Sequence, residues 1–220
     1  MLTRHGLTPL SNPEQHLGQR IDIELSPEGR RQAQKLAIRL RGVEFDRIIT
    51  SPLVRARETA ASVAGDGSIA VEYDPRLKEM DYGHWEGLTY EQIAERDAEY
   101  RAKWEQDPAT LPCPGGESGR DVATRVHAFL ADLLADHVSR HGAHAAQERA
   151  VLAVGHSSTN RILCCVAIDI EVREYRQRLV QSQANVTVLR FEHGDGPSYA
   201  RLLVLNDIAH LRPAGAPPWE

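Results

Sequence analysis

The stretch AVLAVGHSS, residues 150–158, joins the most apolar run of the chain to a histidine and two serines. No polar residue interrupts 150–154, so this run predicts a buried strand. The run 160–168 predicts a helix directly after it. A buried strand followed at once by a helix is typical of an α/β fold, in which a mainly parallel sheet carries helices on its faces.

Strand and helix patterns alternate on either side of this stretch. Ser26 and Pro27 predict a helix start, because serine caps free amides and proline fits the first helical position. Ser51 and Pro52 repeat the pattern, and residues 89–92 form a capping box. The expected strands are 1–3, 45–50, 69–73, 150–154, 186–191 and 202–205, and the expected helices are 27–41, 52–65, 89–104, 122–134 and 160–168.

Length and composition favour one domain over residues 1–220, with a loose proline-rich tail from about Arg212. The net charge of −5 provides no general attraction for nucleic acid or an anionic membrane, so an anionic ligand must be held by local arginines. No apolar run approaches the roughly 20 residues that span a bilayer. We therefore expect a cytoplasmic protein that binds neither nucleic acid nor membrane, and its oligomeric state stays open.

The first expected strand is short. Only residues 1–3 precede a polar stretch, against about five or six residues in an ordinary strand. We expect either that the natural chain begins upstream of Met1 or that this strand is truncated.

Four segments, each next to an expected strand end, carry residues suited to phosphoryl transfer. Ligands of open α/β sheets bind beyond the carboxyl ends of the strands. Arg4 and His5 follow the first strand, and an imidazole can attack phosphorus while a guanidinium neutralises its oxygens. Arg55 falls in the first turn of a helix, where backbone amides already favour an anion. Taken alone, the first pair is better explained as a solvated turn, and Arg55 could equally be a helix-surface residue.

The other two segments offer a carboxylate and a second imidazole. The loop 77–87 is rich in aromatic residues and glycine, so it can shield a carboxylate that protonates a leaving alcohol. The candidate carboxylates are Glu79, Asp81 and Glu86. After the buried strand, His156 and Ser157 could place an imidazole and backbone donors on a phosphoryl group. The alternatives are exposed acids and a half-buried histidine beside a capping serine.

Five segments, taken in order, resemble the motifs of the histidine phosphatase superfamily, also called the phosphoglycerate mutase-like family. They are LTRHG (2–6), SPLVRARETA (51–60), LKEMDYGHWEG (77–87), PGGES (114–118) and VGHSS (154–158). Each motif is weak or moderate alone, but five in order are specific. The resemblance implies a three-layer α/β/α sandwich with a mostly parallel sheet and a small helical insertion over the site at about 81–118.

The resemblance also implies a role for each site residue. His5 would be the nucleophile that becomes a phosphohistidine, and Glu79 would donate and accept the proton. Arg4, Arg55 and His156 would form the phosphate pocket. No metal or other cofactor is implied, because two guanidiniums and two imidazoles can take the place of a cation around the phosphoryl oxygens.

Two departures from the family's pattern lie in the loop after the first strand. Many members have asparagine six residues after the catalytic histidine, where this chain has serine followed by asparagine, and many have Gln-Gly where this chain has Leu-Gly. Such positions usually help to hold the phosphate or the substrate. The candidate substrate contacts, including those from the insertion, are Ser11, Asn12, Gly18, Arg20, Tyr82 and Trp85.

The favoured function is a phosphatase that acts on a small phosphorylated metabolite. A phosphoglycerate mutase-type phosphotransferase is the alternative. The mutases of the family are longer and carry Gly-Leu-Asn-Lys after the glutamate-bearing motif, where residues 87–90 here read Gly-Leu-Thr-Tyr. A catalytically idle phosphate-binding module is less favoured, because all five site residues are present.

Overall fold

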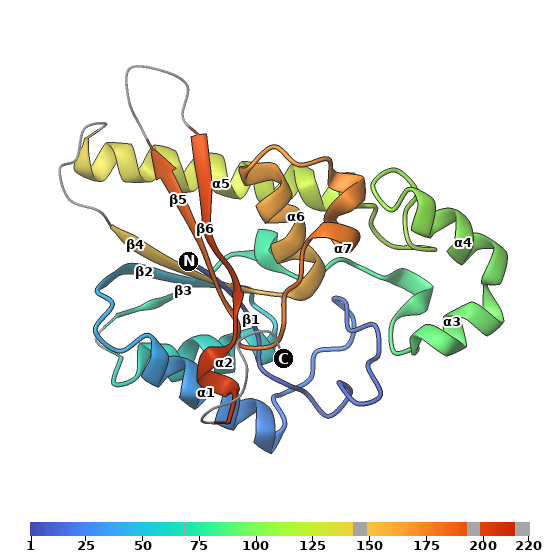
Figure 1. Ribbon diagram of the computed structural model, residues 1–220, viewed down its shortest axis with the longest axis horizontal. Helices are drawn as coiled ribbons and strands as arrows, with labels where there is room; N and C mark the ends of the chain where they lie inside the picture. Colours follow the sequence, from blue (N-terminus) through green and yellow to red (C-terminus); the bar gives the residue numbers. More distant parts are fainter. Residues whose placement is uncertain (68, 143–148, 193–198, 214–220) are drawn as a thin grey trace.

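The computed structural model describes residues 1–67, 69–142, 149–192 and 199–213, so most of the expected tail lies outside the described residues. A six-stranded sheet lies between two layers of helices (Figure 1). The strands are β1 (Leu2–Arg4), β2 (Phe45–Thr50), β3 (Val71–Tyr73), β4 (Ala150–Gly155), β5 (Val186–Glu192) and β6 (Tyr199–Asp207). In the order β3-β2-β4-β1-β5-β6, the first four strands run parallel, and β5 runs antiparallel to both of its neighbours, β1 and β6. The expected α/β fold with a mostly parallel sheet is confirmed.

The helices form the two outer layers. Helices α1 (Pro27–Arg39) and α2 (Val54–Ala64) cover one face of the sheet, and α5 (Gly119–His141) and α6 (Ser157–Ala167) cover the other (Figure 1). A hydrophobic core lies on each face of the sheet. Strand β4 contributes side chains to both cores, because its side chains alternate between the two faces. Leu152 and Val154 pack in the core on the α1 side, whereas Ala153 belongs to the core on the α6 side. Burial of each such large apolar side chain stabilises the fold by about 1.5–3 kcal/mol.

Two helix starts show how capping sets the boundaries. Helix α1 begins at Pro27 behind the side-chain cap of Ser26, as expected. The helix expected from Pro52 begins two residues later, at Val54, so that boundary was wrong. The physical reason is a carboxylate from elsewhere in the chain, since the Val54 amide donates to Asp22 over 2.7 Å.

The helix expected over 89–104 is two helices, α3 (Tyr90–Arg96) and α4 (Ala98–Gln106), although the capping box at its start is present. The break lies at Asp97, whose backbone leaves the helical region with φ −127° and ψ 34°. Its carboxylate accepts a hydrogen bond from the indole of Trp85 over 2.7 Å. Trp85 is fully buried and meets Trp104 edge to face at 5.5 Å between ring centroids, so packing fixes the break.

Most of the remaining helical segments are short. They are η1 (Pro75–Leu77), η2 (Gly83–Trp85), η3 (Val172–Glu174), α7 (Tyr175–Arg178) and η4 (Ala209–Leu211). Segments of three or four residues are too short to show a period, which is why the sequence did not indicate them. Among the described helices, none has the length and apolar character needed to cross a membrane.

The carboxyl ends of three neighbouring strands lie at one edge of the sheet. Arg4 at the end of β1 lies opposite Gly155 at the end of β4, and Thr50 at the end of β2 lies opposite Val154. The residues that follow these strands are therefore neighbours in space although they are far apart in the sequence. Helix α6 begins at Ser157, earlier than expected, so a single residue joins β4 to it.

Candidate active site

His5 lies at the centre of this edge, directly after β1. Its Nδ1 lies 2.7 Å from the backbone carbonyl of Gly6. A carbonyl can only accept a hydrogen bond, so Nδ1 carries the proton and Nε2 keeps its lone pair. Burial, followed by the charges of Arg55 and Arg4, holds the pKa of His5 well below its usual 6.5. The ring is therefore neutral at pH 7 and has the form that a nucleophile requires.

His156, which follows β4, lies beside His5. The two ring centroids are 5.1 Å apart, and both side chains are buried. The Nε2 of His156 lies 2.8 Å from the hydroxyl of Ser51, whereas its Nδ1 is buried without a partner. If the hydroxyl donates a hydrogen bond to Nε2, then Nδ1 carries the proton and can donate a hydrogen bond to an anion. Burial and the nearby cations keep the pKa of His156 well below 6.5, so this ring is also neutral.

Arg55 is fully buried in the first turn of α2. Its Nη atoms donate to the carbonyls of Ile21 (3.2 Å), Leu17 (3.1 Å) and Gly18 (2.8 Å), but its Nε has no partner. Leu17 and Gly18 therefore hold the arginine through their carbonyls. A side chain at position 18 would overlap the carboxylate of Glu86, which explains the glycine there.

Arg4 is held in a similar way at the end of β1. It donates to the carbonyl of Gln181 (3.1 Å) and to the carboxylate of Glu14 (3.1 Å), and its Nε is buried without a partner. The Glu14 side chain is 48% exposed, so this ion pair is open to exchange with a ligand.

The carboxylate of Glu79 lies at the amino end of α6. It accepts hydrogen bonds from the amides of Met80 (2.9 Å), Thr159 (3.1 Å) and Ser158 (3.2 Å). With the side chain only 3% exposed, these bonds fix the carboxylate in one position.

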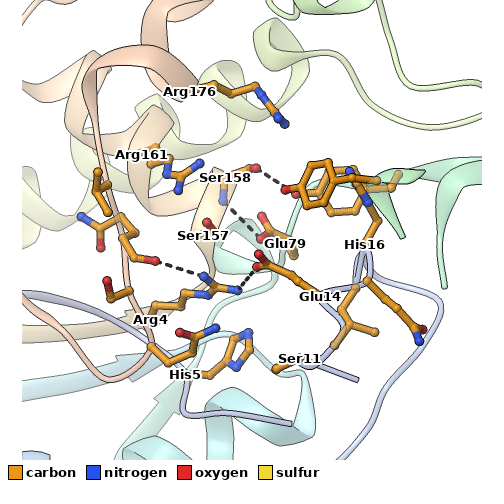
Figure 2. A pocket seen from close by; sticks show the side chains of 18 residues that line it. Arg4, His5, Ser11, Glu14, His16, Glu79, Ser157, Ser158, Arg161 and Arg176 are labelled. Atoms are coloured by element: carbon orange, nitrogen blue, oxygen red, sulfur yellow. Dashed lines mark hydrogen bonds and ion pairs between the residues drawn. The ribbon is translucent and has the colours of Figure 1, made fainter. Parts of the chain in front are cut away.

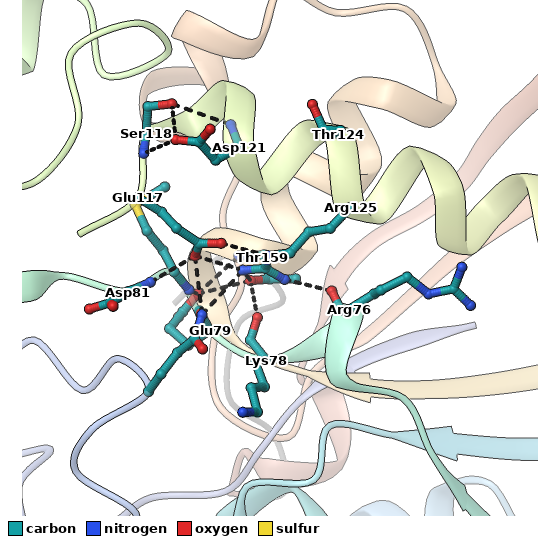
Figure 3. Close-up of polar contacts among 12 residues, drawn as sticks. Arg76, Lys78, Glu79, Asp81, Glu117, Ser118, Asp121, Thr124, Arg125 and Thr159 are labelled. Atoms are coloured by element: carbon teal, nitrogen blue, oxygen red, sulfur yellow. Dashed lines mark hydrogen bonds and ion pairs between the residues drawn. The ribbon is translucent and has the colours of Figure 1, made fainter.

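A half-buried arginine supports the main chain around Glu79, as Figure 3 shows. Arg125 of α5 donates to the carbonyl of Glu79 (3.2 Å) and pairs with Glu117 at 3.0 Å. Glu117 in turn accepts a hydrogen bond from the amide of Asp81 over 2.9 Å. The loop that carries Glu79 is thus tied to the long helix of the outer layer.

A cavity of about 200 Å³ opens above His5 and Arg4 (Figure 2). Of the residues singled out in the sequence, those that line it are Arg4, His5, Ser11, Glu79, Tyr82 and Ser157. The hydroxyl of Tyr82 meets that of Ser158 at 2.8 Å on the cavity wall. Arg55 and His156 are not among the residues that line the cavity, but both are buried next to His5.

The remaining candidates lie away from the cavity. Asn12 is exposed, and Gly18 acts through the carbonyl that holds Arg55. Arg20 pairs with Asp81 at 3.3 Å and donates to a backbone carbonyl of the PGGES loop. Trp85 belongs to the hydrophobic core.

The family model of the histidine phosphatase superfamily (branch 1) matches residues 1–204. The chain belongs to this superfamily. The glucosyl-3-phosphoglycerate phosphatase of Mycobacterium tuberculosis is 33% identical over 175 residues, which cover 80% of this chain and 77% of that protein. The structure of the alpha-ribazole phosphatase from Shigella flexneri matches with a TM-score of 0.78 at 27% identity, over 93% of this chain and 94% of that one.

A longer relative is the bifunctional protein Rv2228c of Mycobacterium tuberculosis, 35% identical over 204 residues. The match covers 92% of this chain but 52% of that protein, so the chain spans about half the length of this relative. Both the glucosyl-3-phosphoglycerate phosphatase and the alpha-ribazole phosphatase are named as phosphatases. Among the described residues, no group of three or more histidine, cysteine or acidic side chains could hold a metal ion.

Three further residues line the cavity but were not predicted from the sequence. They are His16, Arg161 and Arg176. Arg161 could have been found, because it lies four residues after Ser157 and so on the same face of α6. No signal pointed to His16, which lies in a loop, or to Arg176, whose helix α7 is only four residues long.

Proposed function

We propose that this protein is a metal-independent phosphatase that hydrolyses a small phosphomonoester through a phosphohistidine on His5. One observation carries the proposal. Three buried polar atoms around His5 have no hydrogen-bond partner, namely Arg4 Nε, Arg55 Nε and His156 Nδ1. Leaving such an atom unpaired costs about 1–3 kcal/mol, so a group that pairs with all three at once is favoured there. A phosphoryl group, with its several acceptor oxygens, is such a group.

The proposed reaction has two steps. In the first, Nε2 of His5 attacks phosphorus, the bond to the ester oxygen breaks, and Glu79 gives its proton to the leaving oxygen. In the second, Glu79 accepts a proton from a water molecule that attacks the phosphohistidine, which releases inorganic phosphate and restores His5. Arg4, Arg55 and His156 stabilise the charge on the phosphoryl oxygens in both steps.

The relatives differ in the substrates that their names give. One is named for glucosyl-3-phosphoglycerate and another for alpha-ribazole. The common part is the phosphoryl group, and the residues around His5 recognise that group alone. We therefore propose a small phosphorylated metabolite as the substrate class.

The test is a metal-free screen of the purified protein against 4-nitrophenyl phosphate and a panel of phosphorylated metabolites that includes 2- and 3-phosphoglycerate. Released phosphate and isomerised product are both measured. We expect phosphate release that falls by ~10⁴-fold or more in His5→Ala, because the nucleophile is lost. His127→Ala, which removes an exposed histidine of α5, is the matched control and should retain full activity.

A second readout identifies the intermediate. Rapid acid-free quenching with a radiolabelled substrate should trap a phosphoprotein that is stable in base and labile in acid, and that is absent in His5→Ala. Isomerisation without phosphate release would identify a mutase instead. Equal inactivity of the wild type and His5→Ala over the whole panel would contradict any enzymatic role.

A further inference from the structure

The cavity has a second group of polar residues farther from His5. They are His16, Arg161 and Arg176, called the distal cluster below, and Arg176 lies at the end away from His5. In Figure 2, Arg4 and His5 lie at one end of the cavity and Arg176 at the other, with Arg161 between them. None of these three side chains has a role in the proposed reaction at phosphorus.

Aromatic rings, rather than acids, hold Arg176 in place. Its guanidinium carbon lies 4.8 Å from the ring centroid of Trp104 and 6.0 Å from that of Tyr90. Such contacts attract a cation but leave its charge unneutralised. A half-buried arginine without an acidic partner is therefore compatible with a ligand that supplies the negative charge.

Arg161 adds a second cation on the same wall. Its Nε is buried without a hydrogen-bond partner. In the described part of the chain, neither this arginine nor Arg176 forms an ion pair with an acidic side chain. Such pairs are common elsewhere on the molecule, as between Arg47 and Glu72 at 2.5 Å.

The acids that line the cavity do not neutralise the distal cluster. Glu14 pairs with Arg4 at 3.1 Å, and Glu79 is held by backbone amides at the start of α6. Two positive charges at the distal end therefore face the open cavity.

His16 contributes a hydrogen-bond acceptor. Its Nδ1 lies 3.2 Å from the carbonyl of Leu88, so Nδ1 carries the proton, and its Nε2 is buried without a partner. Burial lowers the pKa of His16 to about 4, which keeps the ring neutral at pH 7. The ring is fixed against Tyr82 in an edge-on contact at 4.9 Å. A hydroxyl group of a ligand is the natural donor to such a nitrogen.

We propose that the distal cluster binds a second anionic group of the substrate, with Arg161 and Arg176 on the anion and His16 on a neighbouring hydroxyl. This inference rests on the proposed phosphatase function and narrows its substrate class. The substrate is a small hydroxylated phosphomonoester that also carries a carboxylate or a second phosphate. The anion supplies the partner that Arg161 Nε lacks.

The test compares substrates that differ in the second anion. The probes are 3-phosphoglycerate, glycerol 3-phosphate, which replaces the carboxylate by a hydroxymethyl group, and glycerol 1,3-bisphosphate, which keeps the hydroxyl and carries a second phosphate. We expect kcat/KM for 3-phosphoglycerate, for the bisphosphate or for both to exceed that for glycerol 3-phosphate by at least ~10-fold, because hydrogen bonds to charged groups contribute about 1.5–3 kcal/mol. The probe that gains more identifies the anion as carboxylate or phosphate.

Two variants link this preference to the distal cluster. Arg176→Gln and Arg161→Gln should each remove most of the preference and should change kcat/KM for 4-nitrophenyl phosphate by less than about two-fold. Arg176→Lys should restore part of it. The matched control is Arg173→Gln, an exposed arginine three residues away, which should leave the preference intact. An equal loss on all substrates, or no preference in the wild type, would overturn the proposal.

A binding measurement separates this proposal from the proposed reaction. If 4-nitrophenyl phosphate and every other probe resist hydrolysis, the phosphatase function has failed. Calorimetric titration of His5→Ala with 3-phosphoglycerate, the bisphosphate and glycerol 3-phosphate then tests the distal cluster alone. At least ~10-fold tighter binding of one of the two probes that carry a second anionic group, lost in the additional variant Arg176→Gln, would support it, and equal affinities would refute it.

Discussion

The two ends of the cavity are held in place by different parts of the chain. At the His5 end, backbone groups fix the side chains: a carbonyl orients His5, three carbonyls hold Arg55, and three amides hold Glu79. At the distal end, side chains do most of this work, because aromatic rings hold Arg176 and pack against His16, whose Nδ1 also donates to the carbonyl of Leu88. Backbone contacts are independent of side-chain identity. The fold can therefore preserve the chemistry at one end while the other end changes with the substrate.

The largest effect that tests this contrast is expected for Glu79→Gln. An amide cannot protonate the leaving oxygen, so kcat should fall by about 10²–10³-fold for an alkyl phosphate. The loss should be less than about ten-fold for 4-nitrophenyl phosphate, whose leaving group needs little protonation. Steady-state kinetics on both substrates measure the difference, and Glu95→Gln, an exposed acid of α3, is the control. The same loss on both substrates would show that Glu79 has only a structural role.

A smaller effect is expected on stability, where the two ends should differ. Arg55→Leu leaves the carbonyls of Leu17, Gly18 and Ile21 without their donor, so the free energy of unfolding should fall by about 3 kcal/mol. Arg176→Leu removes only contacts with aromatic faces and should cost about 1 kcal/mol. Urea denaturation measures both.

The control for this comparison is Arg57→Leu, an exposed arginine on the same helix as Arg55, which should change stability by less than about 0.5 kcal/mol. A loss for Arg176→Leu as large as that for Arg55→Leu would show that the distal end is part of the structural framework. The contrast between the two ends would then be wrong.

The sequence could predict the His5 end because that end depends on strand order and helix starts. His5 and His156 each follow an apolar strand, and parallel strands end at the same edge of a sheet. Arg55 occupies the first turn of a helix, as expected, even though that helix begins two residues later than Pro52 indicated. Glu79 needed the resemblance to a family, because three acids in one loop were equally suitable by residue type.

The distal end could not be predicted, because no periodic pattern leads to it. His16 lies in a loop whose path is set by contacts with distant residues, such as the hydrogen bond between its own amide and Leu88. Arg176 lies on a helix of four residues, too short to show amphipathic spacing. Gly18 was expected near the substrate, but its role is a backbone carbonyl aimed at Arg55, which residue identity alone does not reveal.

The smallest effect concerns the pH dependence of stability at the distal end. The pKa of His16 is about 4 in the folded protein, below the value of about 6.5 expected in the unfolded chain. Between these values the unfolded state binds more protons, so the free energy of unfolding falls as the pH falls below 6.5. From pH 7 to pH 5 this one histidine should lower stability by about 2 kcal/mol.

The measurement is the change in unfolding free energy between pH 7 and pH 5 for the wild type and for His16→Gln, which cannot titrate in this range. His5 and His156 are also buried and neutral, but they are present in both proteins, so their contributions cancel. The wild type should lose about 2 kcal/mol more than the variant. Equal losses would mean that folding does not lower the pKa of His16. The ring would then be protonated in the folded protein at pH 5, where its Nε2 would donate to the second anion instead of accepting from a substrate hydroxyl.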